Sequence, residues 1–343
     1  MKTKRQVFYL LFFLNLIAYS QSSWQWLNPL PQGNTLTGIQ YINSNVGYAV
    51  GYYGTVLKTT NGGINWIKMN TGLTEYFNAL SFIDENTGYV VGNSGLIIKT
   101  TDSGNSWVWQ NSGSNQSLNC IVAIDQNLAF IGGGYNGYVQ SHVLKTTNGG
   151  NNWEIFSSGT FKDLYGIDFV DENNGMLVGD SGAVLNTKNS GLTWSTQVSG
   201  VYAHLSSVHF LNVNTGIAVG ENGWIVKTTN GGTSWNARSI NYDDYRVVKF
   251  IGQNKVIAVG GWYFTEKGLV SVSTDGGDNW THQNNAGKQE LLSASVIGLN
   301  DIIICGWFGA LIKSTDGGQN WLNLNQTLQR ELSKVFFFDQ STG

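Results

Sequence analysis

Proline and charged residues are both scarce in this chain of 343 residues, which contains two prolines and 12% charged residues. Its abundant hydrophobic, glycine and asparagine residues exclude an intrinsically disordered chain. The formal net charge of −3 and the lack of a basic stripe exclude the usual electrostatic surface for nucleic acid, so no such partner is expected. Beyond the N-terminus no segment has a helical period, which favours an all-β fold.

Cysteine is equally rare, with only Cys120 and Cys305 in the chain. Two cysteines cannot form a disulfide framework, and both lie in apolar runs ("LNCIVAI" and "IIICGW"), which predicts two small buried core residues. The histidines lack metal-ligand spacing. No phosphate-binding loop, nucleophile elbow or CxxC motif is present. We therefore expect neither a metal nor a cofactor.

The N-terminus has the pattern of an export signal. The basic segment "MKTKRQ" precedes the apolar run "VFYLLFFLNLIAYS", and the small residues Ala18 and Ser20 fit a cleavage site before Gln21. The sequence therefore predicts a signal peptide at residues 1–20 and a secreted, cell-surface or periplasmic protein with no membrane span after cleavage. An uncleaved anchor helix is the alternative, but the run is short for a bilayer and contains Asn15.

One nine-residue phrase recurs seven times along the chain. It reads "KTTNGGINW" at its first occurrence and "KTTDSGNSW" at its second. The tryptophans that close it are spaced by about 41 to 46 residues, and a fixed period near 40 in a strand-rich chain is typical of a β-propeller. These tryptophans are Trp66, Trp107, Trp153, Trp194, Trp235, Trp280 and Trp321.

Each repeat contains four short apolar runs separated by turns rich in glycine, asparagine and aspartate, which predicts a four-stranded antiparallel blade. We predict a β-propeller over residues 21–343 with seven blades, and with eight as the alternative. The repeats lie near 36–72, 73–113, 114–159, 160–200, 201–240, 241–286 and 287–329. Residues 331–343 resemble the start of an eighth repeat that is cut short.

The phrase itself is predicted to be the hairpin between the third and fourth strands. An acidic or amide side chain in each copy would bond backbone amides of the turn, and the glycine two residues later would adopt a positive φ. The tryptophan would pack back onto the blade. The acidic or amide positions are Asn61, Asp102, Asn148, Asn189, Asn230, Asp275 and Asp316.

This phrase resembles the Asp-box, or bacterial neuraminidase repeat, which is a structural turn away from the ligand face in the families that have it. The longer pattern "TGYVVGNSGLIIKTTDSGNSW" resembles the photosystem II assembly and stability factor family. That resemblance spans about residues 24–343 and implies a seven-bladed, non-enzymatic, chaperone-like binding protein. The family's basic patch is poorly matched, because the expected mature chain has only Arg238, Arg246 and Arg330.

The candidate binding face lies at the opposite end of the blades. The turns between second and third strands are longer in the third repeat ("GGGYNGYVQSHV") and the sixth ("GGWYFTEKG"), and insertions on one face of a repeat protein often mark its binding face. Aromatic residues in these turns, and in the equivalent turns of the first and seventh repeats, suggest a partner, although local packing over the blade ends is the alternative. They are Tyr52, Tyr53, Tyr135, Tyr138, Trp262, Tyr263, Phe264, Trp307 and Phe308.

A second candidate lies on the first strands of repeats four, five and six. Asp168, His209 and Lys249 occupy equivalent positions there and are expected to face the central channel. Together they would supply an acid, a base and a cation. The simpler interpretation is a solvated channel lining.

These patterns favour a non-catalytic propeller that binds a protein or a glycan through the inserted turns. The alternative is a glycan-binding or glycan-active propeller of the sialidase-like or xyloglucanase-like type, because such enzymes share the Asp-box. The few arginines do not match the three that hold a sialidase substrate carboxylate. The two carboxylates of a general glycosidase lie far apart in sequence and cannot be recognised here.

Overall fold

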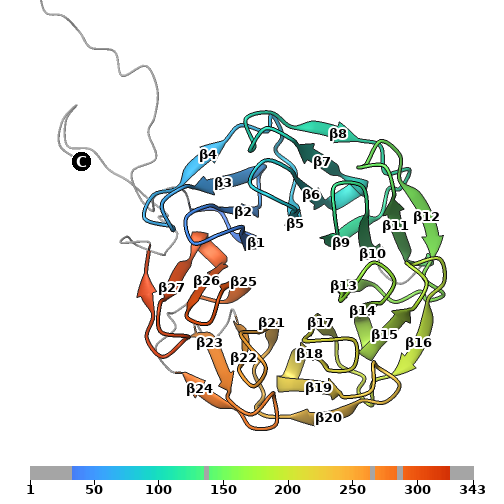
Figure 1. Cartoon of the computed structure of the whole chain (residues 1–343), viewed down its shortest axis with the longest axis vertical. Coiled ribbons are helices and arrows are strands. Elements are labelled where there is room, and N and C mark those ends of the chain that lie inside the picture. The colour runs from blue at the N-terminus through green and yellow to red at the C-terminus, as the bar shows by residue number, and fades with distance from the viewer. Residues whose placement is uncertain (1–32, 135–138, 263–266, 284–288, 325–343) are drawn as a thin grey trace, which may run out of the picture.

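The structure, a computed structural model, describes residues 33–134, 139–262, 267–283 and 289–324. The expected signal peptide at 1–20 and the expected start of an eighth repeat at 331–343 lie outside these residues. The described chain forms seven separate four-stranded antiparallel sheets arranged in a ring (Figure 1). The prediction of an all-β, seven-bladed propeller is confirmed.

The strands follow the chain order within each blade, from the innermost to the outermost (Figure 1). Blade one contains β1 Leu36–Tyr41, β2 Gly47–Gly51, β3 Thr55–Thr59 and β4 Ile67–Met69. Blade two contains β5 Phe77–Phe82, β6 Gly88–Gly92, β7 Ile97–Thr100 and β8 Val108–Gln110. Blade three contains β9 Ser117–Ala123, β10 Ala129–Gly134, β11 His142–Thr146 and β12 Glu154–Ser157. Blade four contains β13 Leu164–Phe169, β14 Gly175–Gly179, β15 Ala183–Thr187 and β16 Ser195–Val198.

The remaining three blades have the same plan. Blade five contains β17 Leu205–Phe210, β18 Gly216–Gly220, β19 Trp224–Thr228 and β20 Asn236–Ser239. Blade six contains β21 Tyr245–Phe250, β22 Val256–Trp262, β23 Lys267–Ser273 and β24 Thr281–Gln283. Blade seven contains β25 Leu291–Ile297, β26 Asp301–Gly306, β27 Leu311–Ser314 and β28 Leu322–Asn323. Single 3₁₀ turns join the second and third strands in several blades: η1 Asn93–Gly95, η2 Asp180–Gly182, η3 Glu221–Gly223 and η5 Trp307–Gly309.

Blade seven packs directly beside blade one, so the described residues complete the ring (Figure 1). The backbone N–H of Tyr41 donates to Ser295 Oγ at 2.9 Å, and that of Ile39 donates to Ser293 Oγ at 3.2 Å. Each sheet within the described ranges is built from consecutive strands only. The ring therefore closes through contacts between blades, without a strand shared between the two ends of the described chain.

Apolar side chains from adjacent blades form the core. One buried cluster joins β2 and β3 of blade one to β26 and β27 of blade seven, and it includes Leu57, Ile303 and Cys305. Cys120 and Cys305 are both buried free thiols, as predicted, and each donates a weak hydrogen bond to a backbone carbonyl at 3.5 Å. Because a lone blade exposes both faces of its sheet, this packing between blades supplies most of the stabilising burial.

The seven repeated phrases form hairpins between the third and fourth strands, here called the box hairpins. In blade one, Asn61 Oδ1 accepts from Thr59 Oγ1 at 3.0 Å and from the N–H of Asn65 at 2.9 Å. Gly63 has φ +90°, and the equivalent glycine has a positive φ in every box hairpin. The predicted roles of these two positions in the turn are confirmed. They follow from local side-chain bonds and from glycine's freedom in the left-handed region.

The tryptophan that ends each box hairpin packs against an aromatic residue in five blades. Trp107 lies edge-to-face with Phe82, with ring centroids 6.3 Å apart and planes at 87°. The other four pairs have the same T-shaped arrangement, which is favoured between aromatic rings. The predicted packing of the tryptophan onto the blade is thus observed, and six of the seven are half-buried rather than fully buried.

The lysine at the start of the phrase joins neighbouring blades. Lys58 Nζ donates to Ser103 O at 3.1 Å, and Lys99 Nζ donates to Gly149 O at 2.7 Å in the following blade. Lys313 Nζ does the same from blade seven to blade one, with Gly62 O at 3.0 Å. The repeated phrase alone did not predict this role. The lysine belongs to the scaffold because it satisfies a turn carbonyl of the next blade.

Candidate functional site

The end of the ring opposite the box hairpins is here called the turn face, because the turns between second and third strands form it. Four predicted aromatic residues of this face, Tyr135, Tyr138, Tyr263 and Phe264, lie outside the described residues. Trp262 ends β22, but its side chain is likewise outside the description. Their predicted roles stay predictions, and the geometry of the face rests on blades one and seven.

Three tyrosines form a cluster at the turn of blade one. The ring centroids of Tyr52 and Tyr76 are 4.5 Å apart, and those of Tyr53 and Tyr76 are 5.2 Å apart. Tyr53 is 57% exposed, whereas Tyr52 is half-buried at the channel mouth. Tyr76 was not predicted, because it lies in the link between blades one and two rather than in a repeated turn. The three rings therefore pack against one another, while Tyr53 remains largely exposed to solvent.

Blade seven places a second aromatic pair next to this cluster. Trp307 and Phe308 lie in η5, with ring centroids 5.9 Å apart, and η5 contacts β1 of blade one. Both side chains are half-buried. The aromatic tips of blades one and seven thus occupy neighbouring parts of the turn face.

Tyr53 and Phe308 have an unusual backbone. Their φ values are +57° and +53°, in the left-handed region that bulky residues rarely adopt. At the same position blades two, four and five have Ser94, Ser181 and Asn222, which are small or polar. Backbone strain of this kind persists where something else requires the residue and is concentrated at functional sites. The bulky aromatic side chains at this left-handed position, here called the strained tips, therefore distinguish blades one and seven from blades two, four and five.

Charged residues lie beside this cluster. Arg246 Nε donates to the buried Glu290 Oε1 at 2.7 Å, and Arg246 Nη2 lies 3.3 Å from Asp244 Oδ2. Arg246 and Tyr52 both line the central channel. Burial, and secondarily the charge of Glu290, raise the pKa of the Tyr52 hydroxyl, so it remains a neutral donor at physiological pH. The mouth of the channel thus combines aromatic surface, a neutral hydroxyl and a paired arginine.

The central channel has a volume of about 840 Å³ and is lined by the seven first strands. Asp168, His209 and Lys249 all line it, in adjacent blades, as expected from the alignment of the repeats. Most residues at this position on the first strands accept a hydrogen bond from a backbone N–H on the first strand of the next blade. The acceptors are Gln40, Ser81, Asp168, His209 and Ser295.

Two of these hydrogen bonds engage Asp168 and His209, the predicted acid and base of the channel. Asp168 Oδ2 accepts from the N–H of Phe210 at 2.6 Å, and His209 Nδ1 accepts from the N–H of Phe250 at 3.3 Å. Burial lowers the pKa of His209 to about 3, and Lys249 acts in the same direction. His209 is therefore neutral at physiological pH, and the nitrogen that could accept a proton already serves the scaffold.

Asp168 and Lys249 influence each other across the channel. Burial raises the pKa of Asp168 to about 6, although Lys249 and the N–H of Phe210 oppose this rise. Burial lowers the pKa of Lys249, and Asp168 opposes that shift. Each group therefore stabilises the charged form of the other, as expected of an acid and a cation in a partly desolvated site.

Within the described ranges, no group of three or more histidine, cysteine, aspartate or glutamate side chains is arranged to hold a metal ion. The described part of the chain also contains no helix with the length and apolar character that crossing a membrane requires.

Comparison with known proteins places this ring in a family. The profile of the photosynthesis system II assembly factor YCF48 family matches residues 16–154 and 195–288, which is more than half of the chain. The chain belongs to this family. The resemblance noted from "TGYVVGNSGLIIKTTDSGNSW" is therefore confirmed. A search of curated proteins found no match to the chain.

Solved structures of the YCF48 family share the fold. One, a YCF48 bound to a D1 peptide, is 20% identical with a TM-score of 0.69, and the match covers 84% of this chain and 93% of that one. YCF48 from Cyanidioschyzon merolae is 18% identical with a TM-score of 0.68, covering 85% and 98% of the two chains. At these identities the structures support the seven-bladed fold alone.

Glycoside hydrolases of family GH74 have a similar ring. The GH74 enzyme of Niastella koreensis is 16% identical with a TM-score of 0.67, and the match covers 84% of this chain but 54% of the enzyme. This YCF48-family chain therefore corresponds to about half the length of that enzyme. The likeness shows a shared propeller architecture and not a shared reaction.

Proposed function

We propose that this YCF48-family propeller is an exported, non-catalytic binding protein whose turn face holds an exposed peptide segment of a partner protein. The observation on which this depends most is the pair of strained aromatic tips, Tyr53 and Phe308, in the adjacent blades one and seven. Large rigid aromatic side chains supply much of the binding energy at protein interfaces. The left-handed backbone belongs to the shared turn, but a bulky aromatic side chain in it costs stability that Ser94 or Asn222 avoids.

The neighbourhood of these tips suits a peptide. Tyr52 and Tyr76 extend the aromatic surface, and Arg246 with Glu290 adds polar groups at the channel mouth. A YCF48 relative has been solved with a D1 peptide bound, which supports peptide binding as a capacity of the family. This chain has few arginines, so its peptide is expected to be less acidic than a ligand recognised by a basic patch.

Two features favour a binding role over catalysis. The carboxylate of Asp168 and Nδ1 of His209 both hold the next blade, so the channel constellation is explained by the scaffold. In addition, the low pKa of His209 removes it as a base near neutral pH. The proposed export rests on the N-terminal signal pattern alone, which lies outside the described residues. Detecting a mature N-terminus at Gln21 in secreted protein would support it.

Selection of peptides on the folded protein tests the proposed function. Peptides enriched from a random library would be measured by calorimetry against the native protein and against the double variant Tyr53→Asn, Phe308→Asn. Asparagine tolerates the left-handed backbone, as Asn222 does in blade five, so the fold should be retained. We expect the double variant to bind at least about tenfold more weakly, equal to about 1.4 kcal/mol, with an unchanged or higher melting temperature.

The matched control is Trp109→Ala, which removes a 72% exposed aromatic residue from an outer strand and should leave peptide binding unchanged. Equal binding by the native protein and the double variant would contradict the assignment to the turn face. A selection that yields no binding peptide would contradict peptide recognition.

The second candidate function is action on, or binding of, a glycan, which the similarity of the fold to GH74 enzymes supports. A panel of chromogenic glycosides and xyloglucan would test it. Turnover that is lost in Asp168→Asn would favour a glycosidase and overturn the non-catalytic proposal. Binding of a polysaccharide without turnover would instead identify a glycan-binding module.

A further inference from the structure

The boundary between blades four and five differs from the others on the box-hairpin face. In the other blades whose repeated phrase begins with lysine, this lysine on the third strand lies opposite a residue on the second strand. Lys58 lies opposite Tyr48, and Lys99 lies opposite Tyr89. In blade four the corresponding pair is Met176 with Asn186. The shorter asparagine side chain is held by Gln197 Nε2, which donates to Asn186 Oδ1 at 3.0 Å.

The lysine that blade four lacks has a defined place in its neighbours. In blade three, Lys145 Nζ lies 5.5 Å from the centre of the Phe130 ring and donates to Ser190 O of blade four at 2.7 Å. The equivalent carbonyl after blade four is that of Gly231. In blade six, Val272 replaces the lysine, but Lys255 from an adjacent turn lies beside Gly317 of blade seven. In blade five, Lys227 Nζ pairs with Asp278 Oδ1 in the next box hairpin at 2.7 Å rather than with a turn carbonyl. Among the described boundaries, that after blade four is the one where no lysine of the preceding blade bonds or closely approaches the next box hairpin.

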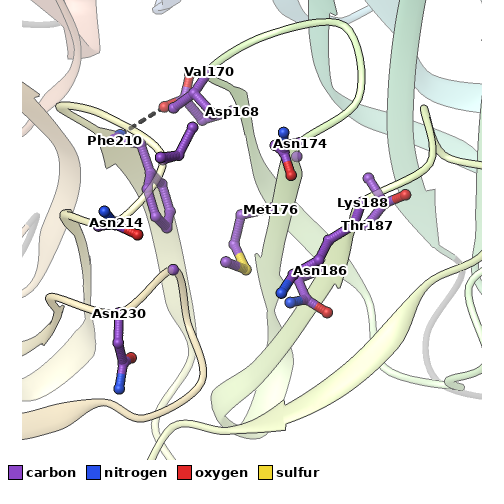
Figure 2. A pocket seen from close by; sticks show the side chains of 13 residues that line it. Asp168, Val170, Asn174, Met176, Asn186, Thr187, Lys188, Phe210, Asn214 and Asn230 are labelled. Atoms are coloured by element: carbon purple, nitrogen blue, oxygen red, sulfur yellow. Dashed lines mark hydrogen bonds between the residues drawn. The ribbon is translucent and has the colours of Figure 1, made fainter.

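A pocket of about 210 Å³ occupies the vacated space. Figure 2 shows Asn186 and Lys188 on one side of this pocket, Phe210 and Asn214 on the other, and Met176 between them. Since one water occupies about 30 Å³ in the liquid, the pocket can hold a flexible four-carbon chain with a charged end.

The pocket lining matches an ammonium group on an apolar stem. Asp168 contributes a carboxylate to the lining, and its Oδ2 also accepts a hydrogen bond from the N–H of Phe210. Gly231, which has no side chain, lines the pocket with its backbone atoms. Met176, Val213 and Phe210 provide the apolar surface against which the methylenes of a lysine pack. A hydrogen bond from an ammonium to a carboxylate is charge-assisted and stronger than one between neutral groups.

We propose that this pocket binds the side chain of a lysine supplied by a partner protein, in the position that the chain's own lysine fills in other blades. The site is separate from the proposed peptide site, because it lies on the box-hairpin face at the opposite end of the blades. The two can therefore be tested independently.

Lys188 at the rim of the pocket gives the proposal a distinctive prediction. It is exposed, and it stands where the other six box hairpins have threonine, as at Thr60 and Thr147. Its positive charge opposes a bound ammonium group. Replacing it in Lys188→Thr should therefore tighten binding by about two- to fivefold, as expected for loss of one screened like charge.

The methionine methyl groups provide the measurement. The chain has three methionines, and in a protein labelled with ¹³C at these methyls Met176 reports on the pocket. Met69 is the internal control, because its methyl lies beside Gly104 at the boundary where Lys58 fills the equivalent space. The probe is Nα-acetyl-lysine methylamide, titrated alongside its uncharged norleucine analogue.

We expect a saturable shift of the Met176 methyl with the lysine probe, no shift of Met69, and no response to the norleucine analogue. Asn186→Lys, which restores the pattern of the other blades, should abolish the shift while keeping or raising the melting temperature. Equal shifts of Met69 and Met176, an equal response to norleucine, or no saturable shift would each overturn the proposal.

The Lys188→Thr variant also tests the remaining alternative, in which the side chain of Lys188 itself fills the pocket. If this variant lowers the melting temperature and fails to tighten binding, Lys188 itself fills the pocket and the proposal is wrong. None of these outcomes affects the proposed peptide binding, which is measured with variants on the turn face.

Discussion

The two ends of the ring differ in how closely the seven repeats agree. On the box-hairpin face, every blade repeats the same bonds: a side-chain acceptor holds the turn, and a glycine adopts a positive φ. On the turn face, the tips range from Ser94 and Asn222 to Tyr53 and Phe308 at the same strained position. Residues that are the same in all seven repeats are those that the fold of the ring requires. Residues that differ between the repeats are not explained by the fold alone.

This distinction applies to positions rather than to whole faces. The glycine near the end of the second strand, such as Gly220, is present in all seven repeats although it lies at the turn face. Conversely, Asn186 departs from the repeat on the box-hairpin face and leaves a pocket. Four predictions test the distinction, beginning with the largest expected effect.

Gly220→Ala should be the most damaging change. A Cβ at this position would lie 1.9 Å from His204 O, a backbone atom that cannot move independently. We expect a loss of about 3 kcal/mol or more in the free energy of unfolding, measured by denaturant titration. The control is Gly72→Ala, which meets no neighbour but has φ +70° and should cost about 1–2 kcal/mol. Equal losses would mean that close approach is not the reason for the repeated glycine.

Trp107→Ala tests the box hairpin itself. Trp107 lies edge-to-face with Phe82 between blades one and two, so its removal should leave a cavity and cost about 3 kcal/mol in unfolding free energy. Trp109, two residues later, is 72% exposed, and Trp109→Ala should cost less than about 0.5 kcal/mol. Similar values for the two variants would show that the repeated tryptophan does not stabilise the blade.

Asp168→Asn tests a channel position at which the repeats disagree. Because burial raises the folded-state pKa of Asp168 to about 6, the folded state binds the proton more tightly, and this residue's contribution to stability falls as pH rises from about 3.8 to 6. Asparagine can still accept from the N–H of Phe210 and avoids the buried charge. The variant should therefore gain about 1–2 kcal/mol over the native protein at pH 7.5 and little at pH 4.

Denaturant unfolding of the native protein and the variant at both pH values would measure this difference. A variant that is less stable at pH 7.5 than the native protein would show that the Asp168 charge, through Lys249, stabilises the ring.

Ser103→Gly should have the smallest effect. Ser103 has φ +65°, where most box hairpins have a glycine, so the substitution relieves strain in the left-handed region. The exposed bond from Ser103 Oγ to Asn86 Oδ1 is lost, and the unfolded chain gains entropy, which offsets part of the gain. We expect a rise in unfolding free energy of less than about 1 kcal/mol. A clear loss would mean that the serine contributes more than its backbone strain costs.

Much of the fold could be predicted from the sequence, because the repeated phrase reports local chemistry. The positive φ of Gly63, the side-chain bonds of Asn61 and the burial of Cys120 each depend on residues close in the sequence or on a repeated pattern. The channel positions of Asp168 and His209 followed from the alignment of the repeats in the same way.

Contacts between blades were not predictable, because they join residues some 40 positions apart. The bond from Lys58 to Ser103 O and the one from Phe250 to His209 Nδ1 became evident only in three dimensions. Tyr76 was missed because it belongs to a link rather than to a repeated turn. A signal for the pocket did exist: blade four reads "NTK" where the first three blades read "KTT". Its meaning required knowledge of what the lysine does.

Hydrogen exchange measured with and without a selected peptide tests the central claim most directly, because it reports every described turn in one experiment. The account predicts that residues that differ between the repeats bind the peptide, whereas residues shared by all repeats stabilise the ring. Bound peptide should therefore slow exchange at residues 52–54 and 307–309 and leave exchange at residues 60–66 of the first box hairpin unchanged. Protection confined to the box hairpins, with the turns of blades one and seven unaffected, would contradict the account.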